Sequence, residues 1–276
     1  MPELPEVETV VNDLKASNLI GCTIKSSYVG WARTINTHTI DEFEESVKDL
    51  NFLRIYRRAK YIIFQMSQDK LLIIHLRMTG QFSFQSEMPD CKHTHVILEL
   101  NDKRYLCFKD TRKFGRWSLV NSSHELFSKL GPEPLDESIT EDQFYLMCKS
   151  RKRQLKPLLL DQSFIAGLGN IYVDEALFDC GLHPLSSPHR LTRAKTKQLL
   201  ISIRKVLRKG LRNMGTTLGT GAANFYSVSQ RQGNNQEELL VFRRTGSPCY
   251  TCGGTIQRLI VGQRSTHVCT FCQKKV

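Results

Sequence analysis

The sequence contains no long apolar run and little acidic charge. No stretch approaches the about 18 consecutive apolar residues that a membrane-spanning helix needs, and the first residues lack the charged and apolar regions of a signal peptide. We therefore expect no contact with membranes and a cytoplasmic location. The 39 lysine and arginine residues exceed the 27 aspartate and glutamate residues, which gives a net charge of +12. This excess favours a polyanionic partner.

Cysteine is sparse except near the C-terminus. Five of the nine cysteines are scattered, as expected for small buried side chains in a reducing compartment: Cys22, Cys91, Cys107, Cys148 and Cys180. The other four form two C-x-x-C pairs separated by sixteen residues: Cys249, Cys252, Cys269 and Cys272. Two such pairs can converge on one tetrahedral zinc ion, and four protein ligands leave no position for a catalytic water. The spacing predicts one structural Zn2+ and no organic cofactor; disulfides or an unrelated cluster are the alternatives.

The hydrophobic pattern predicts an α+β protein. Apolar residues at helical spacing indicate an N-terminal helix: Leu4, Val7, Val10, Val11 and Leu14. Six short apolar or alternating runs predict the strands of an antiparallel β-sandwich in the first half: 23–29, 61–66, 71–76, 95–100, 105–109 and 116–120.

The second half is predicted to be mostly helical and to end in a β-hairpin that carries the four cysteines. Helices are expected at 142–149 (capped by Thr140 or Glu141), 156–161, 171–180 and 193–214, and hairpin strands at 255–261 and 265–268. A Gly-, Asn- and Ser-rich loop is expected at 215–237. The last of these helices has a basic face, which is more often solvated than bound to DNA. We expect three domains: 1–131, 136–235 and 240–276.

The N-terminus combines an amine with carboxylates. Removal of the initiator would leave Pro2 as a free secondary amine, and an α-amino group titrates at roughly 7.7–8. Such an amine can attack a sugar C1′ atom and form a charged iminium, which accepts electrons during elimination. Glu3 and Glu6 would share one helix face beside it. Proline and acidic residues are also ordinary in a first helical turn, so this feature alone favours a structural role.

Eight motifs occur in order along the chain. They are Pro2-Glu3-Leu4-Pro5-Glu6-Val7-Glu8-Thr9, Arg57-Arg58-Ala59-Lys60-Tyr61, His75-Leu76-Arg77-Met78-Thr79-Gly80, Lys92-His93-Thr94-His95-Val96, Asp110-Thr111-Arg112-Lys113-Phe114-Gly115, Lys156-Pro157-Leu158-Leu159-Leu160-Asp161-Gln162, Gly167-Leu168-Gly169-Asn170-Ile171-Tyr172 and Gln263-Arg264-Ser265-Thr266-His267. Together with the cysteine pairs, they resemble the formamidopyrimidine-DNA glycosylase family over essentially the whole chain.

The resemblance implies a bifunctional base-excision-repair enzyme, a DNA glycosylase and abasic-site lyase. It would act as a monomer on double-stranded DNA containing oxidised bases or abasic sites, in association with the nucleoid. Residues 1–131 would be the catalytic domain, 136–235 a helix–two-turn–helix DNA-binding domain, and 240–276 a zinc finger. Pro2 would form the Schiff base, Glu3 would handle protons at the opening sugar, and Glu6 would support the amine. Lys60 would contact phosphate and donate a proton for β-elimination, and Arg264 would bind phosphate and serve δ-elimination.

The resemblance also implies the DNA contacts. Met78, Arg112 and Phe114 would fill the gap left by the extruded nucleotide; without the resemblance, Met78 and Phe114 would be expected in the core. The remaining predicted contacts are His75, His93, Lys152 and Asn170. From the residues alone, Asn170 would be a helix cap and His93 a surface histidine.

Two positions depart from the family pattern, and two other functions remain open. Phe242 stands where relatives commonly have a tyrosine, and Met214 where they often have glycine. The leading function is excision of 8-oxoguanine and formamidopyrimidines. One alternative is the excision of oxidised pyrimidines by an endonuclease VIII-like enzyme. The other is a non-catalytic, zinc-containing protein that binds damaged DNA.

Overall fold

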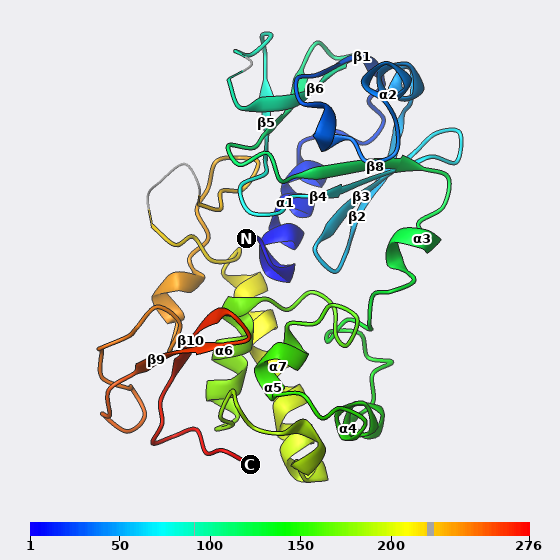
Figure 1. The fold of residues 1–276 in the computed structure, drawn as a ribbon. Helices are drawn as coiled ribbons and strands as arrows, with labels where there is room; N and C mark the ends of the chain where they lie inside the picture. Colours follow the sequence, from blue (N-terminus) through cyan, green and yellow to red (C-terminus); the bar gives the residue numbers. More distant parts are fainter. Residues whose placement is uncertain (91, 220–223) are drawn as a thin grey trace. The chain divides into compact units, whose positions relative to one another are not determined.

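The computed structural model describes residues 1–90, 92–219 and 224–276. They form two compact units, one made of Met1–Ser128 and Asn213–Gln236, the other of Lys129–Arg212 and Glu237–Val276 (Figure 1). The segment 213–236 thus folds with the N-terminal unit, although it follows a helix of the other unit in the chain. The three-domain division at 1–131, 136–235 and 240–276 stays a prediction. Across the described ranges, no helix is both long and apolar enough to cross a bilayer.

The N-terminal unit is built on two four-stranded antiparallel sheets. The first contains, in spatial order, β1 (Ile24–Val29), β6 (Thr94–Leu100), β7 (Tyr105–Lys109) and β5 (Gln81–Gln85). The second contains β2 (Phe52–Arg58), β3 (Tyr61–Met66), β4 (Leu71–His75) and β8 (Arg116–Val120). The predicted helix-plus-sandwich architecture is confirmed. The sequence patterns predicted neither β2, where arginines interrupt the alternation, nor β5, which is only five residues long.

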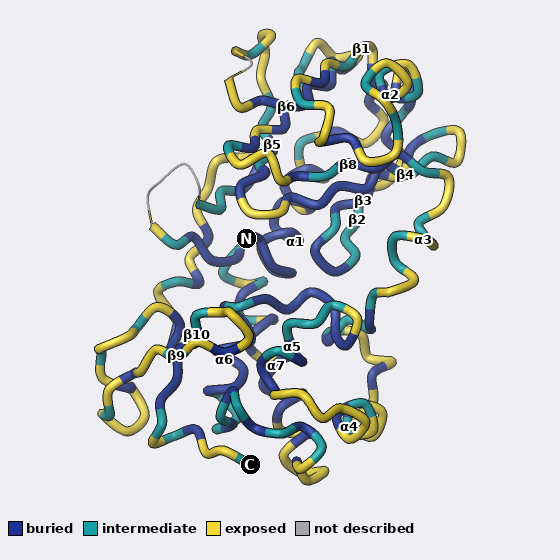
Figure 2. The backbone as a smooth tube through the Cα atoms, in the orientation of Figure 1, coloured by how far each residue is buried: buried dark blue, intermediate teal, exposed yellow. Residues whose placement is uncertain are grey.

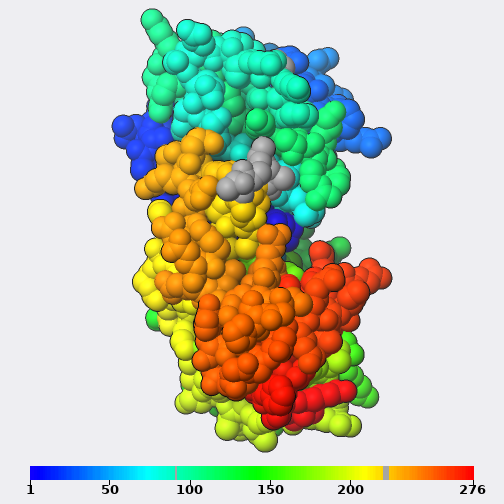
Figure 3. All heavy atoms as spheres, turned by 90° about the vertical axis from the view of Figure 1, so that its left-hand side faces the viewer, coloured from blue at the N-terminus to red at the C-terminus, as the bar shows by residue number. Residues whose placement is uncertain are grey.

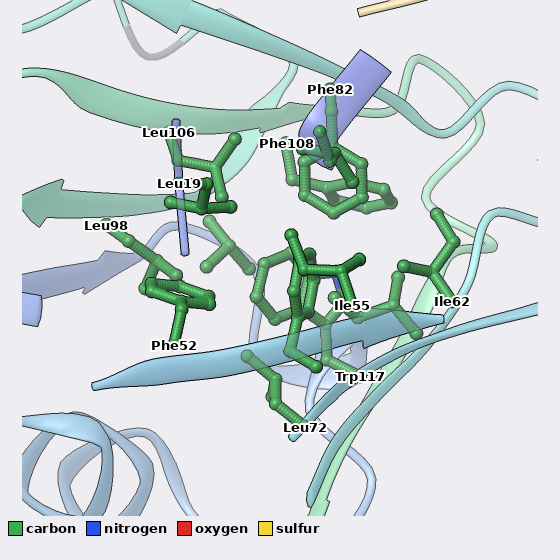
Figure 4. Packing of buried hydrophobic residues seen from close by; sticks show 14 of the residues in the cluster. Leu19, Phe52, Ile55, Ile62, Leu72, Phe82, Leu98, Leu106, Phe108 and Trp117 are labelled. Carbon is green, nitrogen blue, oxygen red and sulfur yellow. The ribbon is translucent and has the colours of Figure 1, made fainter. Parts of the chain in front are cut away.

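Aromatic side chains fill the core of this unit (Figure 4). Trp117 is fully buried and lies edge-on to Phe108, with ring centroids 5.4 Å apart. Burying one such side chain contributes about 2 kcal/mol to folding. The cluster includes Leu19, Phe52, Ile55, Ile62, Leu72, Phe82, Leu98, Leu106, Phe108 and Trp117.

Three helices and a 3-10 turn complete the unit. Helix α1 (Leu4–Ala16) contributes Val7, Val10, Val11 and Leu14 to the same core and is buried along most of its length (Figure 2). The others are η1 (Ala32–Thr34), α2 (Ile40–Val47) and α3 (His124–Phe127). Because α1 is packed on the core, its N-terminal end is a rigid base for the residues placed there.

The C-terminal unit is helical and ends in the hairpin, as predicted. Its elements are α4 (Glu141–Lys149), α5 (Leu155–Leu159), α6 (Asn170–Asp179), η2 (Pro188–Arg190), α7 (Arg193–Arg212), β9 (Gln257–Val261) and β10 (Arg264–Val268), and η3 (Asn235–Glu238) spans the boundary between the units. Thr140 caps α4, accepting the Gln143 N–H at 3.2 Å. Helix α6 is buried, and the ring of Tyr172 leaves room only for glycine at Gly210.

Much of the basic face of α7 holds neighbouring segments in place. Arg204 donates from Nε to Pro134 O at 2.8 Å and from Nη2 to Ile139 O at 2.8 Å. Lys205 forms an ion pair with Asp179 at 2.6 Å. These contacts are intramolecular. That the face is solvated and not bound to DNA stays a prediction.

The scattered cysteines behave as small apolar residues. Cys22, Cys107 and Cys148 are buried and Cys180 is half-buried; Cys91 lies outside the described residues. Burial raises the pKa of the Cys148 thiol and of the Cys180 thiol to about 12. Neither is a thiolate at neutral pH, so neither is a reactive nucleophile.

Candidate functional site

The first residues of the chain form a tightly hydrogen-bonded helix start. Pro2 is buried, and Glu3 is the N-cap of α1, with 3% of its surface exposed. Glu6 accepts the Glu3 N–H at Oε2 (2.8 Å) and the Thr216 N–H at Oε1 (2.8 Å). Glu6 therefore uses both carboxylate oxygens to hold the helix start and the incoming segment 213–236.

Four charged residues surround the terminal amine. Burial lowers the pKa of the N-terminal ammonium, Glu3 and Glu6 oppose this shift, and Lys60 and Arg112 reinforce it. In the described chain this amine belongs to Met1, and removal of Met1 would transfer its role to Pro2. A lowered pKa increases the unprotonated, nucleophilic fraction near neutral pH. The structure thus gathers around one amine the charged residues that the motifs had singled out from distant parts of the chain.

Lys60 and His75 lie at the same end of the second sheet, where β3 begins and β4 ends. Lys60 is only 4% exposed, in the turn between β2 and β3, where Arg57 donates to Ala59 O at 2.9 Å and pairs with Glu8 of α1 at 2.7 Å. Burial, then Arg77 and Lys60, lowers the pKa of His75 to about 3.

The neutral ring of His75 has a defined proton position. Its Nδ1 accepts the Arg77 N–H at 3.0 Å, so the ring proton lies on Nε2. His75 therefore offers one N–H donor and no charge at neutral pH, which suits a hydrogen bond to a phosphate oxygen.

Met78, Arg112 and Phe114 form one exposed cluster instead of joining the core. Met78 is 40% exposed and Phe114 44%. The Arg112 Nη1 atom lies 3.0 Å from the Met78 sulfur, and the guanidinium carbon lies 4.9 Å from the centre of the Phe114 ring. The expectation of core positions from residue type alone is wrong here. A thioether, a guanidinium and an aromatic ring held together at the surface can replace base stacking and pair with an orphaned base.

Asp110 organises the two loops that carry this cluster, a role that its place in the Asp110–Gly115 motif did not indicate. It is 1% exposed. Its Oδ1 accepts from the Thr79 hydroxyl and from Arg112 N (3.2 Å), and its Oδ2 accepts from Gly115 N (2.6 Å). An aspartate that bonds the backbone two residues on is a known turn signal, and the Asp110-Thr111-Arg112 run contained it.

His93 lies against the same loop. It is exposed and left-handed (φ 63°), and its carbonyl accepts the Asp110 N–H at 2.8 Å. Asp110 therefore ties His93, Met78 and Arg112 into one loop cluster, although these residues come from three separate motifs.

In the C-terminal unit, the hairpin presents Arg264. Gly262 and Gln263 are left-handed (φ 55° and 60°) and form a two-residue turn. Arg264 is exposed and is the first paired residue of β10, opposite Val261, instead of a turn residue. The next carbonyl, Ser265 O, accepts from Asn170 Nδ2 at 2.9 Å. The amide nitrogen of Asn170 has a second N–H, which can donate to a further acceptor. Lys152 is exposed in the segment before α5.

A buried ionic network supports this hairpin, and the analysis of the sequence had assigned it no role. Lys156 and Asp174 are both fully buried and pair at 2.6 Å. Lys156 Nζ also donates to Ser265 O at 2.9 Å, and Asp174 accepts the His267 N–H at 2.9 Å. The residues around Lys156 do not indicate that its charge is buried, because the partner, Asp174, lies on another helix.

The four clustered cysteines fit a zinc ion. Their sulfur atoms all lie within 4.8 Å of one another, with 3.8 Å from Cys249 to Cys272 and 3.5 Å from Cys252 to Cys269. A tetrahedral site with Zn–S bonds of about 2.3 Å has sulfur atoms about 3.8 Å apart. Burial opposes ionisation of Cys249, yet backbone hydrogen bonds from Cys252 and Thr251 lower its pKa to about 7. The residues bind one structural Zn2+ at the C-terminal end of the chain, coloured orange to red in Figure 3.

Both departures from the family pattern have a structural setting. Met214 is left-handed (φ 56°) after the end of α7, a conformation that costs a non-glycine residue about 1–2 kcal/mol. Phe242 packs edge-on against His267, with ring centroids 4.8 Å apart, and its N–H bonds Glu175 at 2.9 Å. A phenylalanine keeps this packing without the hydroxyl of a tyrosine.

Sequence comparison matches three family descriptions along the chain. Residues 1–117 match the formamidopyrimidine-DNA glycosylase N-terminal domain, residues 130–221 match its H2TH domain, and residues 246–275 match a zinc finger found in FPG and IleRS.

Curated relatives and solved structures match over nearly the full length. The formamidopyrimidine-DNA glycosylase of Protochlamydia amoebophila is 49% identical, over 100% of both chains. That of Herpetosiphon aurantiacus is 42% identical, over 99% of this chain and 100% of the relative. A crystal structure of a Lactococcus lactis FPG mutant with Fapy-dG-containing DNA has a TM-score of 0.91 at 36% identity, covering 99% of this chain and 100% of that one. Another, of the Lactococcus lactis protein with abasic-site DNA, has a TM-score of 0.90 at 34% identity, with the same coverage.

Proposed function

The chain belongs to the formamidopyrimidine-DNA glycosylase family, and we propose that Pro2, freed by removal of Met1, is the nucleophile with which it excises oxidised purines. The protein is a DNA glycosylase that acts on damaged duplex DNA and an abasic-site lyase. The proposal concerns which residues perform these steps and on which lesions. The observation that carries it is that Pro2 is buried at the start of α1 between Met1 and Glu3, beside the hydrogen-bonded pair of Glu3 and Glu6.

The chemistry begins with attack of the Pro2 nitrogen on C1′ of the damaged nucleotide. The bond from C1′ to the base breaks, and the base leaves with its electron pair and takes up a proton. Glu3 donates a proton to the ring oxygen as the C1′–O4′ bond opens, which leaves a C1′=N iminium. Glu6, already bonded to Glu3 N and Thr216 N, keeps the amine in place.

Strand cleavage follows by elimination from the iminium. Loss of a C2′ proton expels the 3′ phosphate, and Lys60, buried at the β2–β3 turn, donates a proton in this β-elimination. A second elimination expels the 5′ phosphate, with Arg264 of the hairpin bound to the backbone. The iminium carries a positive charge without needing a proton, so both steps proceed at neutral pH.

The exposed loop cluster would stabilise the extruded state. Extrusion of a nucleotide costs a few kcal/mol in lost stacking and pairing. Met78 and Phe114 would take over part of the stacking, and Arg112 would pair with the orphaned base. His75, His93, Lys152 and Asn170 would contact the backbone. With a net charge of +12 and duplex DNA as its substrate, the enzyme would act as a monomer in the cytoplasm, associated with the nucleoid.

Borohydride trapping on a duplex with one 8-oxoguanine opposite cytosine tests this proposal. Borohydride reduces the iminium to a stable amine, so protein and DNA become covalently joined. We expect a trapped band with protein whose Met1 is removed, verified by intact mass. Pro2→Gly should lose nearly all trapping and excision, because the secondary amine is gone.

Binding to a duplex with a tetrahydrofuran abasic analogue is the control. This analogue cannot form an iminium, so Pro2→Gly should bind it as tightly as the wild type does. Loss of this binding would make the N-terminus architectural. Absence of trapping by processed wild-type protein, on 8-oxoguanine as well as on abasic DNA, would refute the nucleophile assignment. Faster release of thymine glycol than of 8-oxoguanine would overturn the purine preference.

A further inference from the structure

A second carboxylate of α1 binds the segment 213–236. Asp13 is 9% exposed and accepts three hydrogen bonds from this segment. Its Oδ2 accepts from Ser229 N at 3.0 Å and from Ser229 Oγ at 2.6 Å, and its Oδ1 accepts from Arg231 Nη2 at 2.7 Å. These bonds, Ser229 foremost, lower the pKa of Asp13 against the opposing effect of burial, so it is ionised at neutral pH.

Glu6 and Asp13 bind two different parts of the segment 213–236. They are seven residues apart on α1, so they share one helix face about 10 Å apart along the axis. Glu6 accepts from Thr216 N near the start of the segment, and Asp13 accepts from Ser229 and Arg231 in its returning part. One helix face thus carries the amine at its end and both anchors of the segment.

The two parts of the segment are also joined to each other. Thr217 donates from Oγ1 to Phe225 O at 2.8 Å and accepts the Gly233 N–H at 2.9 Å. Val228 is buried in the core of the unit, and Phe225 packs against the same core. Gly215 lies against Glu6, where a Cβ atom would meet the Glu6 side chain at 2.8 Å. The returning part is therefore held by core packing, by its bonds to Thr217 and by the polar contacts with α1.

We propose that Asp13 is a positioning residue for base excision, which holds the returning part of the 213–236 segment beside the departing base. This inference rests on the proposed function. The amine must contact C1′, and the base to be removed is bonded to that same atom. Thr216 is one hydrogen bond from Glu6, and Glu6 is one from Glu3. The returning part is bonded to the residue after Thr216 through Gly233 N and Thr217 Oγ1, so it also lies within reach of that base.

Excision and nicking should respond differently to loss of the Asp13 contacts. Excision needs the base to be seated against the protein, whereas nicking at a preformed abasic site involves no base. Loss of the Asp13 contacts should therefore slow excision and leave nicking nearly unchanged. A purely structural role of Asp13 would lower both rates in proportion.

Single-turnover rates on two duplexes test it, one with 8-oxoguanine opposite cytosine and one with a preformed abasic site. For Asp13→Asn we expect about tenfold slower excision, the effect of weakening hydrogen bonds to a charged group, and nicking within about twofold of the wild type. Ser229→Ala should act in the same direction. The double variant should be hardly slower than Asp13→Asn alone, because the two changes remove one interaction.

Asp102→Asn is the matched control. Asp102 accepts from Arg104 Nε at 2.8 Å, and Arg104 donates to Ser17 O at 2.6 Å, so this pair also braces α1 but reaches it from the β6–β7 turn. The control should leave the ratio of excision to nicking unchanged.

The outcomes distinguish the inference from the function it rests on. A wild type that nicks abasic DNA but releases no 8-oxoguanine or formamidopyrimidine refutes the proposed function itself. A normal wild type, with an unchanged rate ratio in Asp13→Asn and Ser229→Ala, refutes the role of Asp13. Should Asp13→Asn not fold, Ser229→Ala decides alone, since it removes only a hydroxyl.

Discussion

At the scale of single residues, Glu6 shows why local sequence rules leave the N-terminus ambiguous. Its bond to Glu3 N is half of a capping box, an ordinary way to begin a helix. Its second oxygen binds Thr216 N, 210 positions away in the chain. The carboxylate of Glu6 therefore both caps the helix and supports the amine. Only its bond to Thr216 N goes beyond ordinary helix capping, and this bond distinguishes the functional interpretation from the structural one.

His75 should make the protein sensitive to acid. Its pKa falls from 6.5 to about 3 on folding, chiefly through burial, so between these values the unfolded chain binds a proton that the folded protein does not. Stability is therefore lost as the pH falls below 6.5 and does not change through this group above it. In thermal unfolding, the Tm of His75→Gln should fall less than the Tm of the wild type between pH 6.5 and pH 4.5.

The exposed His124 provides the comparison. His124→Gln should follow the wild-type dependence of Tm on pH. If His75→Gln follows it too, acid sensitivity comes from other groups.

At the scale of elements, the β9–β10 hairpin depends on contacts at both of its ends. The four cysteines lie on the loops beside the strands, and the Lys156–Asp174 pair holds the backbone next to Arg264. A short two-stranded hairpin is at best marginally stable alone. The metal ion and the buried pair together hold the backbone of Arg264 in a fixed position.

Cys269→Ser should release the zinc and weaken DNA binding. Structural zinc contributes about 10–16 kcal/mol in zinc-finger peptides, so without it the hairpin cannot hold Arg264 in position. We expect zinc content, measured by elemental analysis, to fall from one ion per chain to nearly none. Affinity for abasic-analogue DNA should fall by about tenfold or more, the cost of lost charge-assisted contacts.

Cys180→Ser is the control for this prediction, because Cys180 is a half-buried thiol outside the cluster. It should retain the ion and the affinity for DNA. Unchanged zinc content in Cys269→Ser would disprove the assignment of the four ligands.

At the scale of the whole molecule, the net charge of +12 is only partly available to DNA. Several cations are engaged within the protein, among them Arg57 with Glu8 and Lys205 with Asp179. The exposed Arg112, Lys152 and Arg264 and the buried Lys60 are the cations assigned to the substrate. The composition indicates the kind of partner, and the fold determines which charges remain for it.

DNA affinity should therefore depend steeply on salt. Three of these cations, Lys60, Lys152 and Arg264, are assigned to phosphates, and they predict a slope of about −2.7 in a plot of log K against log salt, or about a 40-fold loss of affinity between 50 and 200 mM. Lys152→Gln should reduce the slope by about one. Fluorescence anisotropy with a labelled duplex measures both.

Lys25→Gln is the reference, since Lys25 is exposed on β1 and pairs with Asp49 at 3.9 Å. It should keep the wild-type slope. A slope near zero for the wild type would contradict the assigned phosphate contacts.

The sequence by itself determined the class of fold, the family and the zinc site. Strand alternation and helical spacing are local properties of the sequence, and the spacing of two C-x-x-C pairs identifies the four zinc ligands. The sequence patterns did not predict β2, because its arginines interrupt the alternation, nor β5, whose alternation extends over only five residues. The element order that they did predict is the order that the structure contains.

Only the tertiary structure decided how the charges are distributed among roles. Asp13, Lys156 and Asp174 are buried carboxylates and an ammonium whose partners lie elsewhere in the chain. A buried charge is tolerable only where a partner compensates its desolvation, and that partner is chosen by the fold and not by sequence distance. The fold also placed the apolar side chains of Met78 and Phe114 at the surface beside Arg112, where residue type alone predicts burial.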